Sequence, residues 1–183
     1  MKKTIKLSLL FVVFMLSVSV TVTQAQSTST AQPRYNDVVG ENPNAEADMR
    51  VVGDYVNALV SGDLEKAKTL LANNYKGYGP APTDSATSEQ VISDWQRNYK
   101  STSNRKVSFA TQTFRVKSGI YKGDWVSLWG DYSFSENGKD VNFPFQYTAR
   151  IANGKIETDR IYYDRLYMLQ TLGYTVTPPE NNK

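Results

Sequence analysis

The chain has 183 residues, with 21 Lys and Arg against 18 Asp and Glu, and it contains neither Cys nor His. These absences exclude disulfides, Ser-His-Asp and Cys-His nucleophilic sites, and the nitrogen and sulfur ligands that zinc and copper prefer. Acid–base chemistry would therefore fall to Asp, Glu, Lys or Tyr. An all-oxygen Ca²⁺ or Mg²⁺ site stays open, but no EF-hand spacing is present, so we expect no metal and no cofactor.

The first 25 residues have the layout of a secretory signal peptide. Lys2, Lys3 and Lys6 precede an apolar run over residues 7–22, and Ala25 offers a small residue for cleavage. The run is short for a membrane span, which needs about 20 apolar residues, although a retained N-terminal anchor is the alternative. We predict an exported protein, periplasmic or extracellular, that leaves the membrane after cleavage.

Removal of this segment changes the charge argument. Its three lysines account for the whole excess of base, so the remainder carries 18 basic and 18 acidic residues. A neutral remainder offers no basic surface for nucleic acid or for an anionic membrane. We therefore expect no nucleic-acid partner.

Residues 26–44 are rich in Ser, Thr, Gln, Asn and Pro without periodicity, and they predict a flexible leader. A domain then begins at Ala45 and extends to Tyr174. Its first helix ends at Ser61-Gly62 and carries apolar residues at helical spacing: Met49, Val52, Tyr55, Val56 and Leu59.

Two further helices are predicted before residue 100. Asp63 can cap the second, whose apolar stripe is Leu64, Ala67, Leu70 and Leu71. An extended piece over residues 75–80 follows, and Ser88 can cap a third helix over residues 89–99.

From Val107 the apolar period changes from 3.6 to 2, which is typical of strands. Four long strands are predicted, over residues 107–117, 124–135, 141–151 and 155–163. Asn137-Gly138 and Asn153-Gly154 predict tight hairpins, because both turn positions favour positive φ. Pro144 cannot donate to a ladder and implies an edge or a bulge.

The last strand ends at Asp164, and a short helix over residues 165–172 precedes a frayed tail at 175–183. Helices followed by strands indicate an α+β fold. We expect a cone-shaped, curved antiparallel sheet packed with three N-terminal helices and a short C-terminal helix. The space between sheet and helices is a natural pocket.

Three features resemble the SnoaL-like family of the nuclear transport factor 2-like superfamily. They are the helix–Ser61-Gly62-Asp63–helix start, the Asn153-Gly154 hairpin, and the ending Asp164-Arg165-Leu166-Tyr167-Met168-Leu169-Gln170-Thr171-Leu172-Gly173. Thr171 stands where the family often has Gln. The resemblance implies a conical α+β barrel with an apolar pocket, homodimers formed through the outer sheet face, and, in polyketide cyclases, an acid–base Asp at the position of Asp164.

Asp164 has three alternative roles. Burial in the pocket would raise its pKa and suit it to proton transfer, or it could bind a ligand. It could also simply cap the helix that follows it. Asp131 is the one carboxylate considered as its partner, whereas alternation places Asp159 on the opposite face from Asp164.

Tyr and Trp combine apolar area with one polar group, which suits a pocket for a small hydrophobic ligand. The candidates for lining it are Tyr78, Trp95, Trp129, Tyr147 and Tyr162. The alternative is that these aromatic residues belong to the core or to a dimer interface.

Three functions remain open. The preferred one is an exported domain that binds a small, largely apolar molecule. A cofactor-independent isomerase or cyclase using Asp164 as acid–base is the first alternative. A non-catalytic module for dimerisation or protein interaction is the second.

Overall fold

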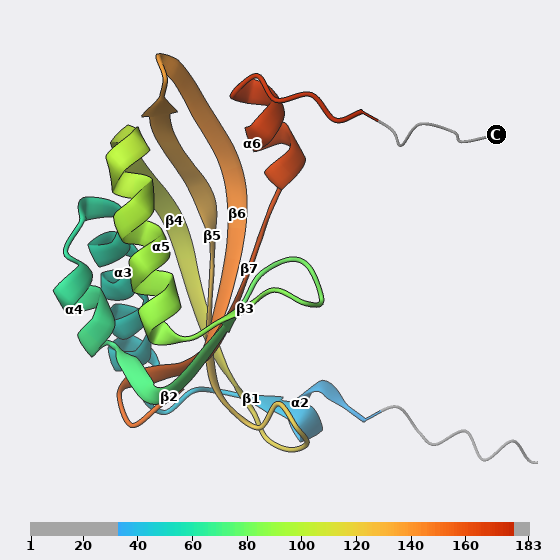
Figure 1. Ribbon diagram of the computed structural model, residues 1–183. Helices are drawn as coiled ribbons and strands as arrows, with labels where there is room; N and C mark the ends of the chain where they lie inside the picture. Colours follow the sequence, from blue (N-terminus) through green and yellow to red (C-terminus); the bar gives the residue numbers. More distant parts are fainter. Residues whose placement is uncertain (1–32, 178–183) are drawn as a thin grey trace, which may run out of the picture. The chain divides into compact units, whose positions relative to one another are not determined.

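The structure, a computed structural model, describes residues 33–177. Seven strands form one curved, open sheet in the order β1-β4-β5-β6-β7-β2-β3, and helices α3, α4 and α5 lie against one of its faces (Figure 1). The strands are β1 (Val39–Gly40), β2 (Leu71–Tyr78), β3 (Ser85–Ala86), β4 (Thr102–Val116), β5 (Gly123–Glu136), β6 (Lys139–Ala152) and β7 (Lys155–Tyr163). The helices are α2 (Tyr35–Val38), α3 (Ala45–Ser61), α4 (Leu64–Thr69), α5 (Ser88–Ser101) and α6 (Arg165–Thr171). The predicted α+β architecture is confirmed.

The helix boundaries follow from local capping chemistry. Gly62, with φ of 96°, ends α3 in the left-handed region, and the Asp63 carboxylate accepts the Lys66 backbone N–H at the start of α4. For α5 the expected cap, Ser88, is wrong by one residue. Thr87 caps the helix and forms a capping box with Gln90.

The side of the sheet that faces the helices carries the apolar core. Alternate residues of β6 face the helices, and apolar residues of α3 belong to the same core cluster. The predicted hairpins are present, with positive φ at Asn137-Gly138 and Asn153-Gly154. The inward-facing residues of β6 are those the alternation predicts: Val141, Phe143, Phe145, Tyr147, Ala149 and Ile151.

β6 is a central strand, yet it accommodates Pro144. Its pairing with β7 stops at Phe145, so only β5 lies beside it at Pro144. Pro144 therefore does lie at an edge of the sheet, but only locally, because β7 has already ended beside it.

A bulge in β7 decides which residues face the helices. Ile151 pairs with Ile156 but Arg150 pairs with Thr158, which leaves Glu157 as an extra residue. One extra residue moves every later side chain to the other face of the sheet. Asp159 consequently lies opposite Ala149, on the helix side.

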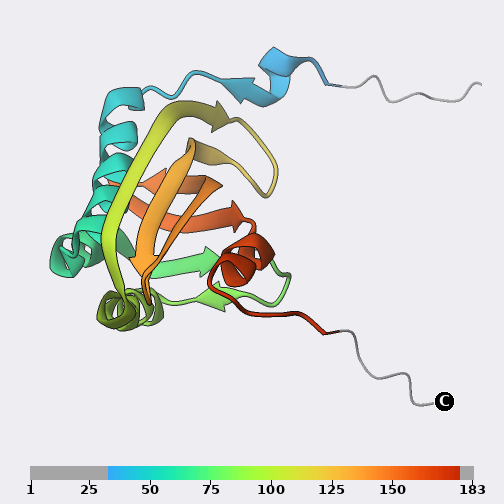
Figure 2. The same cartoon turned by 90° about the horizontal axis from the view of Figure 1, so that it is seen from above.

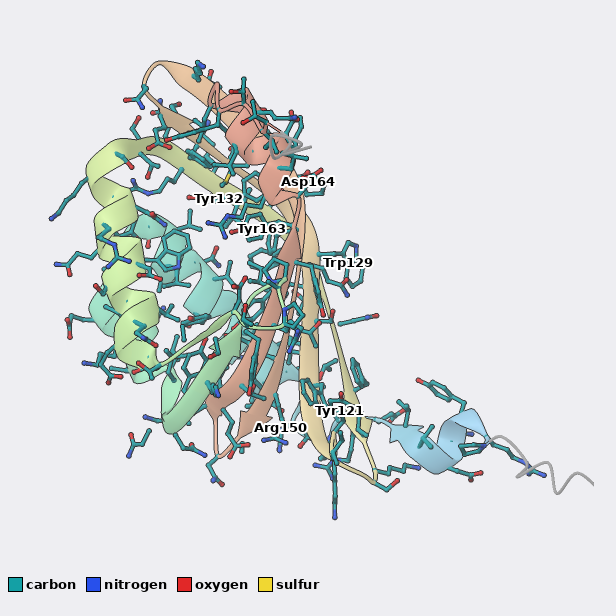
Figure 3. The ribbon with its side chains drawn as sticks, turned by 45° about the vertical axis from the view of Figure 1, so that its right-hand side comes forward. Tyr121, Trp129, Tyr132, Arg150, Tyr163 and Asp164 are labelled. Atoms are coloured by element: carbon teal, nitrogen blue, oxygen red, sulfur yellow. The ribbon has the colours of Figure 1, made fainter. Side chains whose placement is uncertain are left out.

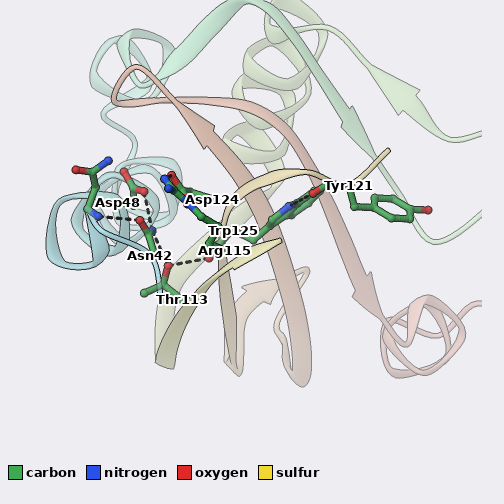
Figure 4. A network of polar contacts seen from close by, with 8 residues as sticks. Asn42, Asp48, Thr113, Arg115, Tyr121, Asp124 and Trp125 are labelled. Carbon is green, nitrogen blue, oxygen red and sulfur yellow. Dashed lines mark hydrogen bonds and ion pairs between the residues drawn. The ribbon is translucent and has the colours of Figure 1, made fainter. Parts of the chain in front are cut away.

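Part of the predicted leader is ordered in the structure. Residues 35–40 form α2 and β1, and β1 pairs with β4 through Val39 and Val116. The Asn42 amide donates to Asp48 Oδ2 and to Thr113 Oγ1, both at 2.8 Å, and Thr113 donates to the Trp125 carbonyl (Figure 4). The structure thus corrects the leader prediction over residues 35–42, because the β1–β4 pairing and the hydrogen bonds of Asn42 connect this segment to β4 and α3. The predicted signal peptide, residues 1–25, lies outside the described residues.

Asn42→Ala is expected to lower the free energy of unfolding by roughly 1–3 kcal/mol, because it leaves the buried Asp48 carboxylate without this donor. Chemical denaturation measures the change. Asn73→Ala, at an exposed position, is the matched control and should be close to neutral. An equal effect of the two substitutions would contradict an anchoring role for Asn42.

No helix within residues 33–177 is long and apolar enough to cross a membrane.

Candidate functional site

A pocket of about 710 Å³ lies between the inner face of the sheet and helices α3, α5 and α6. Viewed from above, the strands curl around the space that α5 and α6 border (Figure 2). Most of its lining is apolar or aromatic, and the aromatic members are Tyr55, Tyr75, Tyr78, Trp95, Tyr132, Phe134, Phe143, Phe145, Tyr147 and Tyr163. Such a volume and lining are typical of sites for small organic molecules.

The polar centre of this pocket is Asp159. Its Oδ2 accepts the Tyr75 hydroxyl at 2.7 Å and the Tyr147 hydroxyl at 2.6 Å. The three residues come from β7, β2 and β6, and only 6% of Asp159 is exposed. A charged acceptor with two short hydroxyl bonds is a rigid, well-defined group.

Gly77 makes room for this cluster. A Cβ atom at this position would lie 2.9 Å from Asp159 Oδ1 and closer still to the Tyr75 hydroxyl. The parallel pairing of β2 with β7 places Gly77 directly beside Asp159. Any side chain here would displace the carboxylate or the tyrosine.

Burial is the main cause of the pKa shifts at this site. It raises the pKa of Asp159 to about 6, although hydrogen bonds from Tyr147, Tyr75 and the Tyr78 backbone oppose the shift. Burial, together with the nearby Asp159 charge, also raises the pKa of Tyr55, Tyr75 and Tyr147 well above 10. The phenols therefore remain protonated donors, and Asp159 is the group that titrates near neutral pH.

Asp164 lies elsewhere. It is exposed at the start of α6, outside the lining of the pocket, and its Oδ1 accepts the Tyr167 backbone N–H at 2.8 Å (Figure 3). This geometry matches the third of the alternative roles of Asp164, that of a helix cap. Asp131, its considered partner, is also exposed and faces away from the pocket, opposite Pro144.

Asp164→Ala is expected to destabilise the protein by about 1 kcal/mol and to leave ligand retention unchanged, because it removes one cap. Asp164→Asn preserves an acceptor oxygen and should be close to neutral. Asp63→Ala removes the equivalent cap of α4 and provides the scale in the same denaturation experiment. Loss of a bound ligand in Asp164→Asn would instead assign Asp164 to the site.

The five predicted aromatic residues divide between the two faces of the sheet. Trp95 and Tyr147 line the pocket. Tyr78 borders it, while its ring lies 5.0 Å from the Arg160 guanidinium carbon, on the outer side. The predictions for Trp129 and Tyr162 are corrected: both are about half exposed, and they pair with Gln146 in one row on the outer face of the sheet. Figure 3 shows Trp129 on this outer face.

The bulge in β7 explains the corrected position of Tyr162 and the missed Asp159, whereas Trp129 lies on β5, outside the bulge. A hairpin continued by simple alternation from Asn153-Gly154 would pair Asp159 with Thr148, on the outer face, and would place Tyr162 inside. The extra residue Glu157 exchanges these two positions. The sequence carries no local signal for Asp159, because β7 holds two acids, Glu157 and Asp159, and only the strand register decides which of them faces the helices.

Within residues 33–177, no three acidic side chains lie close enough together to hold a metal ion. Asp159 is surrounded by phenols and apolar groups instead.

No family model matches the sequence, and no curated protein matches it either. Solved structures do resemble the fold. IdmH of Streptomyces antibioticus, a candidate polyketide cyclase, is 17% identical with a TM-score of 0.57, covering 69% of this chain and 99% of that one. A hypothetical protein of Catenulispora acidiphila with a ketosteroid isomerase-like fold, in complex with trimethylamine, is 21% identical with a TM-score of 0.57, covering 70% and 97%.

A third similar structure is an LEH-like epoxide hydrolase of M. tuberculosis, 17% identical with a TM-score of 0.55, covering 71% of this chain and 92% of that one. At these identities the likeness concerns the fold. The chain has the nuclear transport factor 2-like fold, as the resemblance in its sequence predicted.

Proposed function

We propose that this domain binds a small, largely apolar molecule in the pocket, with one polar group of that molecule directed at Asp159. The observation that supports this most is the pocket of about 710 Å³ in which a buried cluster of two hydroxyls and the Asp159 carboxylate lies among aromatic side chains. A few placed polar groups in an apolar cavity are typical of ligand sites. The trimethylamine complex of the Catenulispora protein is a further instance of a small molecule with this fold.

Native mass spectrometry of the gently purified protein tests this proposal. We expect an adduct of small-molecule mass that Met168→Trp reduces, because Met168 lines the pocket from α6. Gln170→Trp, on the exposed side of the same helix, is the matched control and should retain the adduct. Absence of any adduct, together with failure to bind added apolar probes, would contradict ligand binding.

Proton transfer by Asp159 is a second candidate function. A carboxylate with a pKa of about 6 suits a general base near neutral pH, and the cyclase-like and hydrolase neighbours are consistent with catalysis in this fold. In this function Asp159 takes the acid–base role that was one of three alternatives for Asp164. Conversion of a β,γ- to an α,β-unsaturated cyclic ketone, followed by absorbance, is the assay. A rate above background that Asp159→Asn abolishes supports catalysis, and no turnover leaves binding as the function.

The outer face of the sheet supports a homodimer. Trp129 and Tyr162 are exposed there on β5 and β7, with the uncharged Gln146 between them. We propose that a second copy of the chain covers this row, since exposed aromatic residues on one face mark interfaces. Sedimentation analysis should give a dimer that Trp129→Glu converts to a monomer. A monomeric wild type would contradict this.

Export is proposed on residues 1–25 alone. Cell fractionation and N-terminal sequencing should find a mature chain beginning at Gln26 outside the cytoplasm. Recovery of the uncleaved chain in the membrane fraction would favour the retained anchor.

A further inference from the structure

The charge of Asp159 has no cation to balance it. Within residues 33–177 it forms no ion pair, and its polar neighbours are neutral phenols. The residues around the pocket carry an excess of acid: Asp84, Asp94, Glu136 and Asp159 against Arg97 and Arg165. Of the two arginines, Arg97 is already paired with Asp94. A positive group in the pocket would therefore be attracted.

The Asp159 carboxylate carries a negative charge, but few of its acceptor positions are free for new hydrogen bonds. Its Oδ2 already accepts two hydroxyls, and its Oδ1 lies against the backbone at Gly77 and Tyr78. A partner that needs several directed hydrogen bonds from the carboxylate would have to break these contacts. A partner attracted mainly by charge would leave them intact.

Aromatic rings complete the environment. Tyr55, Tyr75 and Tyr147 surround the carboxylate, and the rings of Tyr55 and Tyr147 lie 6.1 Å apart. Trp95 and Tyr132, also 6.1 Å apart, line the pocket farther out. Ring faces attract cations, most strongly when water is excluded, and alkylated ammonium groups are the ligands that combine charge with apolar surface.

We propose that the ligand is an apolar molecule bearing a tertiary or quaternary ammonium group, which lies against Asp159 and the tyrosine rings around it. This inference rests on the proposed ligand-binding function and specifies its ligand class. The positive charge of the ammonium balances the Asp159 carboxylate, and its alkyl groups pack against the aromatic side chains that line the pocket. Neither hydroxyl bond to Asp159 is broken.

The proposal makes binding dependent on pH. The groups that face Asp159 are Tyr55, Tyr75 and Tyr147, and all three stay protonated because burial raises the pKa of each. Asp159, with a pKa of about 6, is the group in this cluster that changes charge between pH 5 and pH 8. Binding of a permanent cation should therefore weaken as the pH falls through 6.

Two probes of the same shape test the ligand class: benzyltrimethylammonium and its uncharged carbon isostere, neopentylbenzene. Ligand-observed NMR at pH 8 should show the cation bound about tenfold or more tightly than the isostere. The ratio of the two affinities should approach one at pH 5 and in Asp159→Asn. It should be unchanged in Asp164→Asn, which alters an exposed carboxylate outside the pocket.

The outcomes separate the two proposals. Equal binding of both probes, or a preference that survives in Asp159→Asn, overturns the ammonium proposal and leaves the ligand pocket standing. Binding of neither probe, with no adduct in native mass spectrometry, overturns the ligand-binding function and this inference with it. Circular dichroism verifies that the Asp159→Asn variant is folded.

Discussion

Raising the pH from about 4 to about 7 is expected to lower the free energy of unfolding of the wild type, relative to Asp159→Asn, by on the order of 3 kcal/mol. The cause is the buried carboxylate. Its pKa is about 6 in the folded protein against an ordinary 3.8, because burial disfavours the charged form. Other carboxyl groups titrate in both proteins, so their contributions cancel in the difference.

The sign follows from proton binding. Between these two pKa values the folded chain holds a proton on Asp159 that the unfolded chain has lost, so stability falls as the pH rises. The contribution is fully present below about pH 4 and is lost once the pH exceeds 6. Asn resembles the protonated acid in shape and does not titrate. Urea denaturation of both proteins at several pH values measures the difference, and parallel curves would contradict a buried, titrating Asp159.

Gly77→Ala adds one methyl group to the lining of the pocket and is expected to destabilise the protein strongly. The new Cβ would collide with the Tyr75 hydroxyl and lie 2.9 Å from Asp159 Oδ1. Relief requires one of them to move, which breaks a buried bond to a charged acceptor. We expect a loss of about 2–4 kcal/mol from overpacking and bond loss together, and loss of ligand binding.

Gly53→Ala is the matched control. Gly53 lies in α3, where an added Cβ comes no closer than 3.8 Å to Phe109. Alanine there should stabilise the helix by up to about 1 kcal/mol. Thermal unfolding of both variants, together with probe binding, measures the contrast. A Gly77→Ala protein as stable as the wild type, with its ligand retained, would show that the cluster tolerates rearrangement.

The architecture was readable from the sequence because it depends on strong periodic signals. The stripe from Val52 to Leu59, the alternation along β6 and the two Asn-Gly turns each specify an element by local chemistry. The parallel pairing of β2 with β7 was missed, since contacts between residues 71–78 and 156–160 leave no local pattern. The short α2 and β1 were missed because they depend on tertiary contacts, namely the pairing of β1 with β4 and the bond from the Lys117 N–H to the Val38 carbonyl.

The pocket was predictable, but its polar centre was not. Tyr147 and Trp95 were among the expected lining residues, and both are there. Asp159 was placed on the face opposite Asp164, and Asp164 was expected to point into the pocket. The extra residue Glu157 sets a register in which Asp159 faces inward instead. A bulge has no reliable sequence signature, so the carboxylate inside the pocket could be recognised only from the register of the strands.

The most direct test of this account is an NMR titration of the side-chain carboxyl carbons, with and without benzyltrimethylammonium. We expect the Asp159 carbon to titrate with a midpoint near pH 6 because burial disfavours the charged form. The probe should move this midpoint to lower pH, while the Asp164 carbon should not respond to it. An Asp159 midpoint near 4 that the probe leaves unchanged would contradict the account, as would a probe response confined to Asp164.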